Sequence, residues 1–302
     1  MTQAEWQGER LAPEQRLIVR FDAPDPLDER AHGFGDAFMA ARFIPPLLAW
    51  AGQQRTQISF VVPPALMGLF AQSFPSAQLV TTTTAPSIRA LDRWGYGMWH
   101  QCEQRLRLRP TWPYLVARAP WSFDPSYLHV GLCSHGGNEE HKRGWDATRS
   151  IHDPRLIEPL FRVPGVIWHW LEVEHAPPPL HVVDHRAALR SWTSTADLIA
   201  GLDAVITVDT AVAHLAGALG RPTWVLLRPP LPTGTRMTPA VTRDATYGDQ
   251  RWNPIAICDG VIAQAPSRDP LYPTARLFHQ PAPGDWAAVI DTVRHTLQEK
   301  LP

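Results

Sequence analysis

The chain has 302 residues, 44% of them hydrophobic, which is enough for two domains that each bury a core. Its formal net charge is −1 at pH 7, so no overall positive field would attract nucleic acid or an anionic membrane surface. Cys102, Cys133 and Cys258 fit neither a disulfide framework nor a metal-binding spacing. No apolar run approaches the roughly 20 residues of a membrane helix, and the polar amino terminus has no signal-peptide core. These features predict a cytoplasmic protein with reduced thiols, no nucleic-acid partner and no integral membrane segment.

The N-terminal part alternates between apolar runs typical of strands and segments typical of helices. The predicted elements are a strand at 16–22, a helix at 36–50, a strand at 57–63, a helix at 65–74 and a strand at 77–83. Pro45 and Pro46 must kink or restart the first helix, because proline lacks the backbone N–H. Residues 92–125 are rich in Trp, Pro and Arg without clear periodicity, which fits a last N-terminal element and a linker.

A second α/β series follows, and it predicts two domains at 1–125 and 126–302. Its predicted elements are a strand entering a glycine-rich loop at 127–138, a helix at 153–163, a strand at 165–173, a helix at 194–203, a strand at 204–208, a helix at 210–219, a strand at 223–227, a strand at 274–280 and a closing helix at 284–301. Residues 229–272 contain Pro and Gly and are predicted to be irregular.

The stretch "ITVDTAVAHLAGALGRPTWVLL" at 206–227 predicts a β–α–β unit of a parallel sheet. Ligands of such sheets bind at the carboxyl ends of the strands, where Asp209 and Thr210 lie. The helix that begins near Ala211 offers unpaired N–H groups and a partial positive charge, so its start is a candidate anion site. His214, one turn further, can face the same side. The alternative is that Asp209 and Thr210 only cap the helix and that His214 is a core histidine.

Four segments together resemble a bacterial glycosyltransferase domain that is often linked to tetratricopeptide repeats. They are "HGFGDAFMAARFIPPLLA", "HVGLCSHGGNEEHKRGWDATRSI", "DLIAGLDAVITVDTAVAHLAGALGRPTWVLL" and "DPLYPTARLFHQPAPGDWAAVI". That domain is in turn similar to the ADP-heptose:lipopolysaccharide heptosyltransferases. The repeats themselves are absent from this sequence. The resemblance spans 16–297, with a poor match at 82–126.

The resemblance implies an α/β chain with the GT-B fold, in which two Rossmann-like domains face each other across a cleft. A nucleotide-diphosphate sugar would bind mainly on the C-terminal domain, and the acceptor would enter over the N-terminal one. The implied reaction is an inverting, metal-independent glycosyl transfer without a cofactor. Candidate acceptors are a glycan, a lipid-linked sugar or a protein.

The resemblance also assigns roles to the turn at Asp209. By the family pattern, Thr210, Ala211 and Val212 would donate hydrogen bonds to the donor diphosphate, and His214 could donate as well. Asp36, which follows Gly35 in "HGFGD", matches the proposed general base that takes the proton of the acceptor hydroxyl. Its alternative role is to cap the helix that starts beside it.

A cation must stabilise the leaving nucleoside diphosphate when no metal does so. The family pattern places Arg149 in this role, with Lys142 and Arg143 as competing choices, and Asn138 beside the same phosphate pocket. A solvated basic loop is the alternative.

The nucleobase pocket would use the end of the 165–173 strand, with Leu171, Glu172 and the 183–184 region as candidates. The cluster His169, His175, His181 and His185 matches no compact metal motif, and we expect it to form a loop by the nucleotide pocket.

The segment after residue 227 departs from the family pattern, which leaves the donor sugar open. A degenerate nucleotide-sugar-binding module with a scaffolding role is therefore the second hypothesis. A sugar-nucleotide epimerase on the same architecture is the third, although the sequence shows no matching acid and base pair for it.

Overall fold

A computed structural model describes most of the chain. The described residues are 4–6, 11, 16–21, 33–81, 88–92, 102–103, 106–136, 148–173, 178–232, 234–236, 252, 256–258, 261–264 and 272–300.

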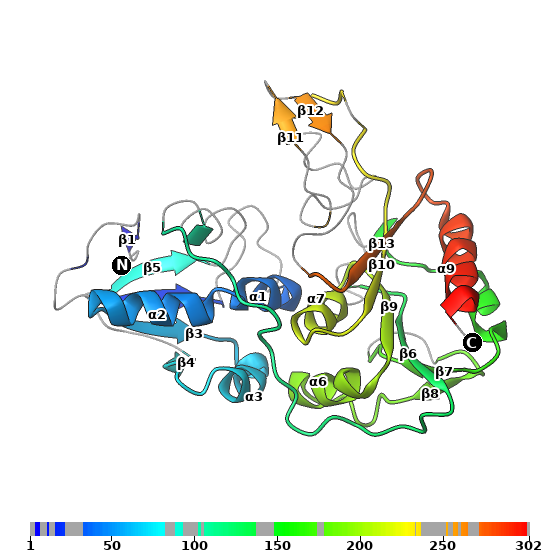
Figure 1. Cartoon of the computed structure of the whole chain (residues 1–302), viewed down its shortest axis with the longest axis horizontal. Coiled ribbons are helices and arrows are strands. Elements are labelled where there is room, and N and C mark those ends of the chain that lie inside the picture. The colour runs from blue at the N-terminus through cyan, green and yellow to red at the C-terminus, as the bar shows by residue number, and fades with distance from the viewer. Residues whose placement is uncertain are drawn as a thin grey trace.

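Two parallel sheets organise these residues, one in each half of the chain (Figure 1). The N-terminal sheet has the order β1-β5-β2-β3-β4. Its strands are β1 (Ala4–Glu5), β2 (Arg16–Arg20), β3 (Gln57–Val61), β4 (Leu79–Val80) and β5 (Ile88–Asp92). The sheet confirms the strands predicted from 16 and from 57, and shortens the one predicted at 77–83 to two residues.

The C-terminal sheet has the order β13-β10-β9-β6-β7-β8, and all its neighbouring strands are parallel. Its strands are β6 (Leu128–Cys133), β7 (Val166–Trp170), β8 (Val182–Asp184), β9 (Ala204–Val208), β10 (Thr223–Leu227) and β13 (Ala275–His279). A separate antiparallel pair, β11 (Ala256–Cys258) and β12 (Val261–Gln264), lies in the segment predicted to be irregular, so that prediction is wrong for these seven residues. The domain boundary at 125 stays a prediction.

Six α-helices flank the sheets in the described part of the chain. They are α1 (Phe34–Ala41), α2 (Ile44–Gln54), α3 (Pro64–Ser73), α6 (Trp192–Gly201), α7 (Ala211–Ala218) and α9 (Trp286–Lys300). The predicted restart at Pro45 and Pro46 is confirmed, because both prolines lie in the first turn of α2, where no N–H is needed. Helix α6 begins two residues before the predicted start at 194, and its N-cap Ser191 forms a reciprocal capping box with Ser194.

The prediction of a single helix at 153–163 is wrong. Two short 3-10 helices stand there, η3 (Pro154–Leu156) and η4 (Glu158–Arg162). Pro154 and Pro159 each remove a backbone donor and oppose a continuous α-helix, so the apolar spacing alone misled the prediction.

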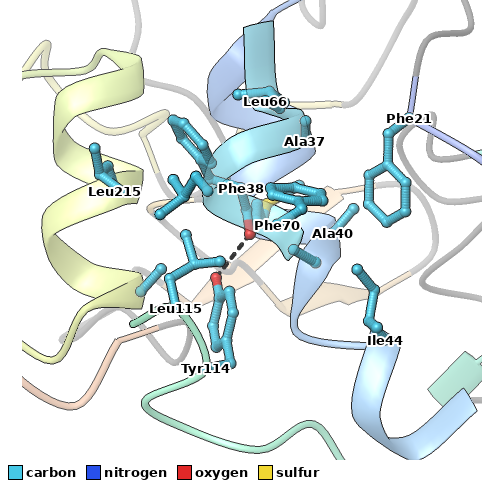
Figure 2. Packing of buried hydrophobic residues seen from close by; sticks show 14 of the residues in the cluster. Phe21, Ala37, Phe38, Ala40, Ile44, Leu66, Phe70, Tyr114, Leu115 and Leu215 are labelled. Carbon is cyan, nitrogen blue, oxygen red and sulfur yellow. Dashed lines mark hydrogen bonds between the residues drawn. The ribbon is translucent and has the colours of Figure 1, made fainter. Parts of the chain in front are cut away.

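The two halves meet through a helix-on-helix contact between α1 and α7, with α3 against α6 beside it (Figure 1). One hydrophobic cluster runs through both halves and includes Phe38, Phe70, Leu115 and Leu215 (Figure 2). Residues 212–218 of α7 are all buried, because the helix is covered by its own sheet on one side and by α1 on the other. A second cluster fills the opposite face of the C-terminal sheet under α9.

The connection at 106–127 has no helix or strand, yet it is bonded to both halves. Val116 N donates to Ser73 Oγ at the end of α3, and its carbonyl accepts from Gln72. Further on, Trp121 N donates to the Asp197 carbonyl of α6. The linker predicted for this region is therefore a packed strap along the boundary between the halves.

Candidate functional site

The topology of the C-terminal sheet fixes where a ligand would bind. Strands that follow β6 extend the sheet in opposite directions, with β7 on one side and β9 on the other. In parallel sheets, ligands bind at the carboxyl ends of the two strands that flank such a switch point, here β6 and β9. Residues 134–136 follow β6, and Asp209 and Thr210 follow β9. The site predicted at Asp209 therefore lies at the switch point of the sheet.

The turn after β9 ends in a capped helix. Thr210 is the N-cap of α7, and its Oγ1 accepts from Val212 N at 3.2 Å. The same hydroxyl lies 3.1 Å from Thr207 Oγ1. No acceptor for Ala211 N occurs among the described contacts, so this N–H remains available at the positive end of α7. The capping alternative thus holds for Thr210 without removing the anion-binding geometry of the turn.

Asp209 does not cap the helix. Its carboxylate is buried, and Oδ1 accepts from Trp252 Nε1 at 2.7 Å. Trp252 is fully buried and also stacks on His214, with ring centroids 4.6 Å apart. The sequence analysis did not identify Trp252 as a site residue, because the residues around it give no sign that it contacts a turn more than forty residues earlier in the chain.

Gly136 and Arg149 lie against this turn. A Cβ at Gly136 would stand 3.0 Å from Thr210 Cγ2, 3.2 Å from Arg149 Nε and 3.3 Å from the Asp209 carbonyl oxygen. Gly136 N donates to the buried Ser150 Oγ at 3.1 Å, which fixes the loop that carries the arginine. The predicted leaving-group cation therefore does lie beside the predicted anion site.

Gly35 and Asp36 approach the same turn from the other half. A Cβ at Gly35 would lie 2.9 Å from His214 Cδ2 and 3.7 Å from Ala211 N. Asp36 occupies the first turn of α1 and is half-buried. Its Oδ2 lies over Gly33, where a Cβ would stand 2.6 Å from it. Gly33 is the N-cap of α1 and Asp36 is its third residue, so the alternative that Asp36 is the N-cap is wrong, although a carboxylate in the first turn suits the helix N-terminus. Its role as general base stays a prediction.

His214 is held inside the protein. It is 2% exposed, and its Nδ1 lies 3.0 Å from Tyr272 Oη. Burial is the main cause that lowers the pKa of His214 to about 4; Asp209 opposes this shift, and the charges of Arg42 and Arg149 contribute to it. The ring is therefore neutral at pH 7. Its predicted contact with a phosphate stays a prediction, and only Nε2 could make it, because Nδ1 is engaged by Tyr272.

Glu172, a predicted nucleobase-pocket residue, holds the loop after β6. It is buried, and its Oε1 accepts from Ser134 N, Ser134 Oγ and His135 N at 2.5, 2.8 and 3.1 Å. Its Oε2 lies 3.1 Å from His135 Nδ1. Leu171 is buried beside it, whereas residues 183–184 are exposed on β8. The Glu172 carboxylate thus orders the backbone that borders the switch point.

Part of the predicted histidine cluster forms a hydrogen-bonded chain. His129 Nδ1 lies 2.9 Å from His169 Nε2, and His169 Nδ1 lies 2.8 Å from His185 Nε2. At the other end, His129 Nε2 lies 2.9 Å from the Asp124 carbonyl oxygen. Burial lowers the pKa of His169 to about 3 and lowers that of His185 as well. His175 lies outside the described residues.

Among the described residues, no three His, Cys, Asp or Glu side chains are grouped so that they could hold a metal ion. Burial also raises the pKa of the Cys133 thiol to about 12, so this cysteine beside Thr210 is a poor nucleophile. Over the same residues, no helix is long and apolar enough to cross a membrane.

A cavity of about 430 Å³ opens on the α9 side of the Arg149 loop. Its lining includes Ser150, His152, Arg228, Gln280 and Trp286. Three other predicted residues, Asn138, Lys142 and Arg143, lie outside the described part of the chain, so the choice between Arg149 and the two competing cations is not made by geometry.

Comparison with known proteins finds one family model that matches part of this site. Residues 190–254 match the model of glycosyltransferase family 9 (heptosyltransferase), a range that contains α6, β9, α7, β10 and Trp252. None of the curated proteins compared with the chain matches it in sequence.

Solved structures extend the likeness to the whole fold. The iron-containing dodecameric glycosyltransferase TibC from enterotoxigenic E. coli H10407 is 11% identical, with a TM-score of 0.55, and the match covers 98% of this chain and 78% of TibC. TibC in complex with ADP-D-beta-D-heptose gives a TM-score of 0.56 at 11% identity, over 97% and 78% of the two chains. E. coli ADP-heptose LPS heptosyltransferase II gives 0.48 at 12% identity, over 95% of this chain and all of that one. The chain thus has a GT-B fold, and the resemblance to heptosyltransferases that its motifs indicated is confirmed.

Proposed function

We propose that the chain is an inverting, metal-independent glycosyltransferase that moves a sugar from a nucleotide-diphosphate donor to a glycan, a lipid-linked sugar or a protein. One observation carries the proposal. At the switch point of the C-terminal sheet, the start of α7 and Arg149 converge, and the start of α1 with Asp36 faces them. Convergent N–H donors and a cation suit a diphosphate, and a carboxylate on the facing half suits a hydroxyl acceptor.

In this proposal, Asp36 accepts the proton of the acceptor hydroxyl as its oxygen bonds to the anomeric carbon. The bond between that carbon and the diphosphate oxygen breaks on the opposite face, which inverts the centre. The leaving diphosphate takes the electron pair, and Arg149 with the N–H group of Ala211 stabilises its charge, since the Val212 N–H that was also predicted to bind it donates to Thr210 Oγ1. Asn138 and Lys142 would border the same phosphates, and the cytoplasm is the proposed compartment.

The donor is best sought first among nucleoside-diphosphate sugars, with ADP-linked sugars as the starting point because the TibC structure holds ADP-D-beta-D-heptose. A ligand that binds the folded chain but not the unfolded chain raises the unfolding temperature by mass action. We expect such a rise with one nucleoside diphosphate and its sugar, unchanged by EDTA. Transfer that stops on chelation and returns with one added metal ion would contradict metal independence.

A second candidate is a nucleotide-sugar-binding module without transfer activity. The observation that favours it is that Asp209 and His214 already have protein partners in Trp252 and Tyr272. This candidate predicts donor binding without transfer to any acceptor and without slow hydrolysis of the donor. Hydrolysis of the bound donor that depends on Asp36 would exclude it.

A further inference from the structure

On the side of the C-terminal sheet that packs against α9, the apolar face ends in a polar pair of residues. Leu226 of β10 and Phe278 of β13 are register partners in the apolar cluster under α9. Side chains alternate along a strand, so Arg228 and Gln280 continue the same face one pair further on. The pairing persists there, because Gln280 N donates to the Leu227 carbonyl at 2.9 Å. Both polar side chains are buried, which costs free energy unless their polar groups are bonded.

Arg228 and Gln280 form part of the wall of the cavity of about 430 Å³ that borders the loop after β6. Its other walls come from residues 148–156 and from the start of α9, where Leu156 and Trp286 supply apolar surface. The volume lies within the range of small-molecule pockets, about 300–1,000 Å³. Helix α7, whose start would hold the donor diphosphate, packs on the opposite face of the sheet (Figure 1). The cavity therefore lies on the other side of the sheet from α7.

The Gln280 side chain brings to this cavity a hydrogen-bond donor without an acceptor. Its Oε1 accepts from Gly284 N at 2.6 Å, and this bond fixes the orientation of the amide, because Nε2 in the same place would face a second donor. Its Nε2 is buried and has no hydrogen-bond partner among the described residues. An unbonded buried N–H group is costly, so a ligand that presents an acceptor oxygen at this nitrogen would be stabilised.

The other polar groups of the wall also favour a ligand that is rich in acceptors. Asp153 Oδ1 and Oδ2 already accept from the Arg155 guanidinium at 2.9 and 2.8 Å. The buried Ser150 Oγ already accepts from Gly136 N at 3.1 Å, and its own hydroxyl proton has no acceptor among the described contacts. Arg228 adds a charge that is positive at every pH where proteins fold. The wall thus offers donors and a positive charge, and an oxyanion matches both.

We propose that this cavity is a second ligand site, which binds a small molecule through an oxyanion, a phosphate or a carboxylate group. The oxyanion accepts hydrogen bonds from Gln280 Nε2 and Ser150 Oγ beside the charge of Arg228. The remainder of the molecule packs against Leu156 and Trp286. The proposal goes beyond the proposed function and does not rest on it, because it uses no group to which that function assigns a role.

The N-terminus of α9 is not the source of the attraction. Asp285 Oδ1 already accepts from Ala288 N at 3.1 Å, and this carboxylate offsets the partial positive charge of the helix end. The site therefore depends on the side chains of its wall, which can be substituted one at a time.

The direct test is an NMR titration of the full wild-type chain with inorganic phosphate at pH 7, followed through the side-chain amides of the glutamines. Gln280→Glu removes one of these signals and so assigns it. We expect the Gln280 signal to shift and to saturate at millimolar phosphate, whereas the signal of the exposed Gln298 stays in place. Sodium chloride of equal ionic strength should leave both signals unchanged. A Gln280 signal that responds neither to phosphate nor to acetate would overturn the proposal.

The matched variants are Gln280→Glu and Gln298→Glu, which add the same charge to the chain. Glu at position 280 keeps the size of the side chain and an acceptor for Gly284 N, but it replaces the unbonded donor with a negative charge. The backbone N–H signal of Gly284 reports phosphate binding in all three proteins, and urea unfolding checks that both variants are folded. We expect Gln280→Glu to raise the phosphate Kd by at least ~10-fold and Gln298→Glu to leave it unchanged. An unchanged Kd in Gln280→Glu would contradict the proposed site.

Two further ligands distinguish the sources of the oxyanion. An equal response of Gln280 to acetate would support a site for carboxylates as well as phosphates, and a response to phosphate alone would support a site for phosphates. A nucleoside diphosphate that binds once per chain and displaces phosphate from Gln280 would show that the cavity belongs to the donor site, and so would exclude a second site. If the wild-type chain transfers no sugar from any donor, the proposed function fails, and these titrations still decide the proposal.

Discussion

Gly35 of α1 and His214 of α7 touch across the boundary between the two halves. A Cβ at position 35 would stand 2.9 Å from His214 Cδ2 and 3.5 Å from Ala211 Cα. Gly35→Ala must therefore push α1 away from α7 or turn the His214 ring. We expect the free energy of unfolding to drop by about 1–3 kcal/mol, as for other overpacked sites, and transfer to fall with it.

The matched control is Gly52→Ala in α2, because a Cβ there would meet nothing within 4 Å. This substitution should be neutral or should stabilise the helix by about 0.5–1 kcal/mol. Urea unfolding of both variants checks the pair. Equal behaviour of the two alanines would show that α1 and α7 are not in contact as described.

Asp36→Asn should keep donor binding and lose transfer. General-base catalysis contributes about 10²–10⁴-fold, so we expect kcat to fall by roughly that factor, with the donor Kd unchanged. Asp285→Asn is the control, because Asp285 Oδ1 accepts from Ala288 N at the start of α9, and this cap is remote from the site. Normal transfer by Asp36→Asn would show that Asp36, like Asp285, only stabilises a helix end.

Arg149→Ala should weaken the binding of nucleoside diphosphates. A charge-assisted hydrogen bond contributes about 1.5–3 kcal/mol, which corresponds to roughly a 10- to 150-fold rise in Kd. Arg155→Ala is the control: it is exposed, pairs with Asp153 at 2.8 Å and should leave Kd unchanged. Titration calorimetry measures both. A large rise in Kd with Lys142→Ala and none with Arg149→Ala would move the leaving-group role to Lys142.

Stability should fall on acidification because His214 is buried in its neutral form. Its pKa is about 4 in the folded chain against 6.5 as the ordinary value, so below pH 6.5 the unfolded chain binds a proton that the folded chain does not. The free energy of unfolding should therefore decrease between pH 6.5 and pH 4, by up to ~1.4 kcal/mol per pH unit from this residue and roughly 3 kcal/mol in all.

Urea unfolding of the wild type and of His214→Gln at several pH values in this window measures that contribution. The variant should show a smaller slope, and His169, whose pKa is lowered to about 3, supplies a further decrease of the same sign in both proteins. Identical slopes for the two proteins would show that His214 is accessible to protons in the folded chain.

The sequence pattern was sufficient to predict those strands and helices whose own residues show an apolar run or a clear start and end. The apolar runs at β9 and β10 and the Gly220–Arg221–Pro222 break after α7 predicted the central unit correctly. Strands β1 and β5 were not predicted, because β1 has only two residues and β5 has charged residues at Arg89 and Asp92 that break its apolar run. The strand form of both depends on pairing with a distant partner. The paired 3-10 helices at 154–162 show the opposite case, in which helical spacing was present but proline removed the bonds.

The candidate site likewise has a part that the sequence predicted and a part that it did not. The predicted anion site at Thr210 follows from a strand, a capped turn and a helix that are adjacent in sequence. The partners that fix this turn, Trp252 and Tyr272, come from a segment without clear periodicity, and the strap residue Tyr114 from another. Only the folded chain brings them together, so the sequence predicted where a ligand would bind but not what holds the two halves in place around it.

The chain of His129, His169 and His185 has a consequence for proton uptake. The Asp124 carbonyl can only accept, so in the uncharged chain His129 carries its proton on Nε2. His169 must then donate from Nε2 to His129 Nδ1, and His185 must donate from Nε2 to His169 Nδ1. The one ring nitrogen of the three that keeps its lone pair is then His185 Nδ1. An incoming proton can therefore bind to this chain only at His185 Nδ1. His169 and His129 become charged only when protons shift along the hydrogen bonds between the three rings.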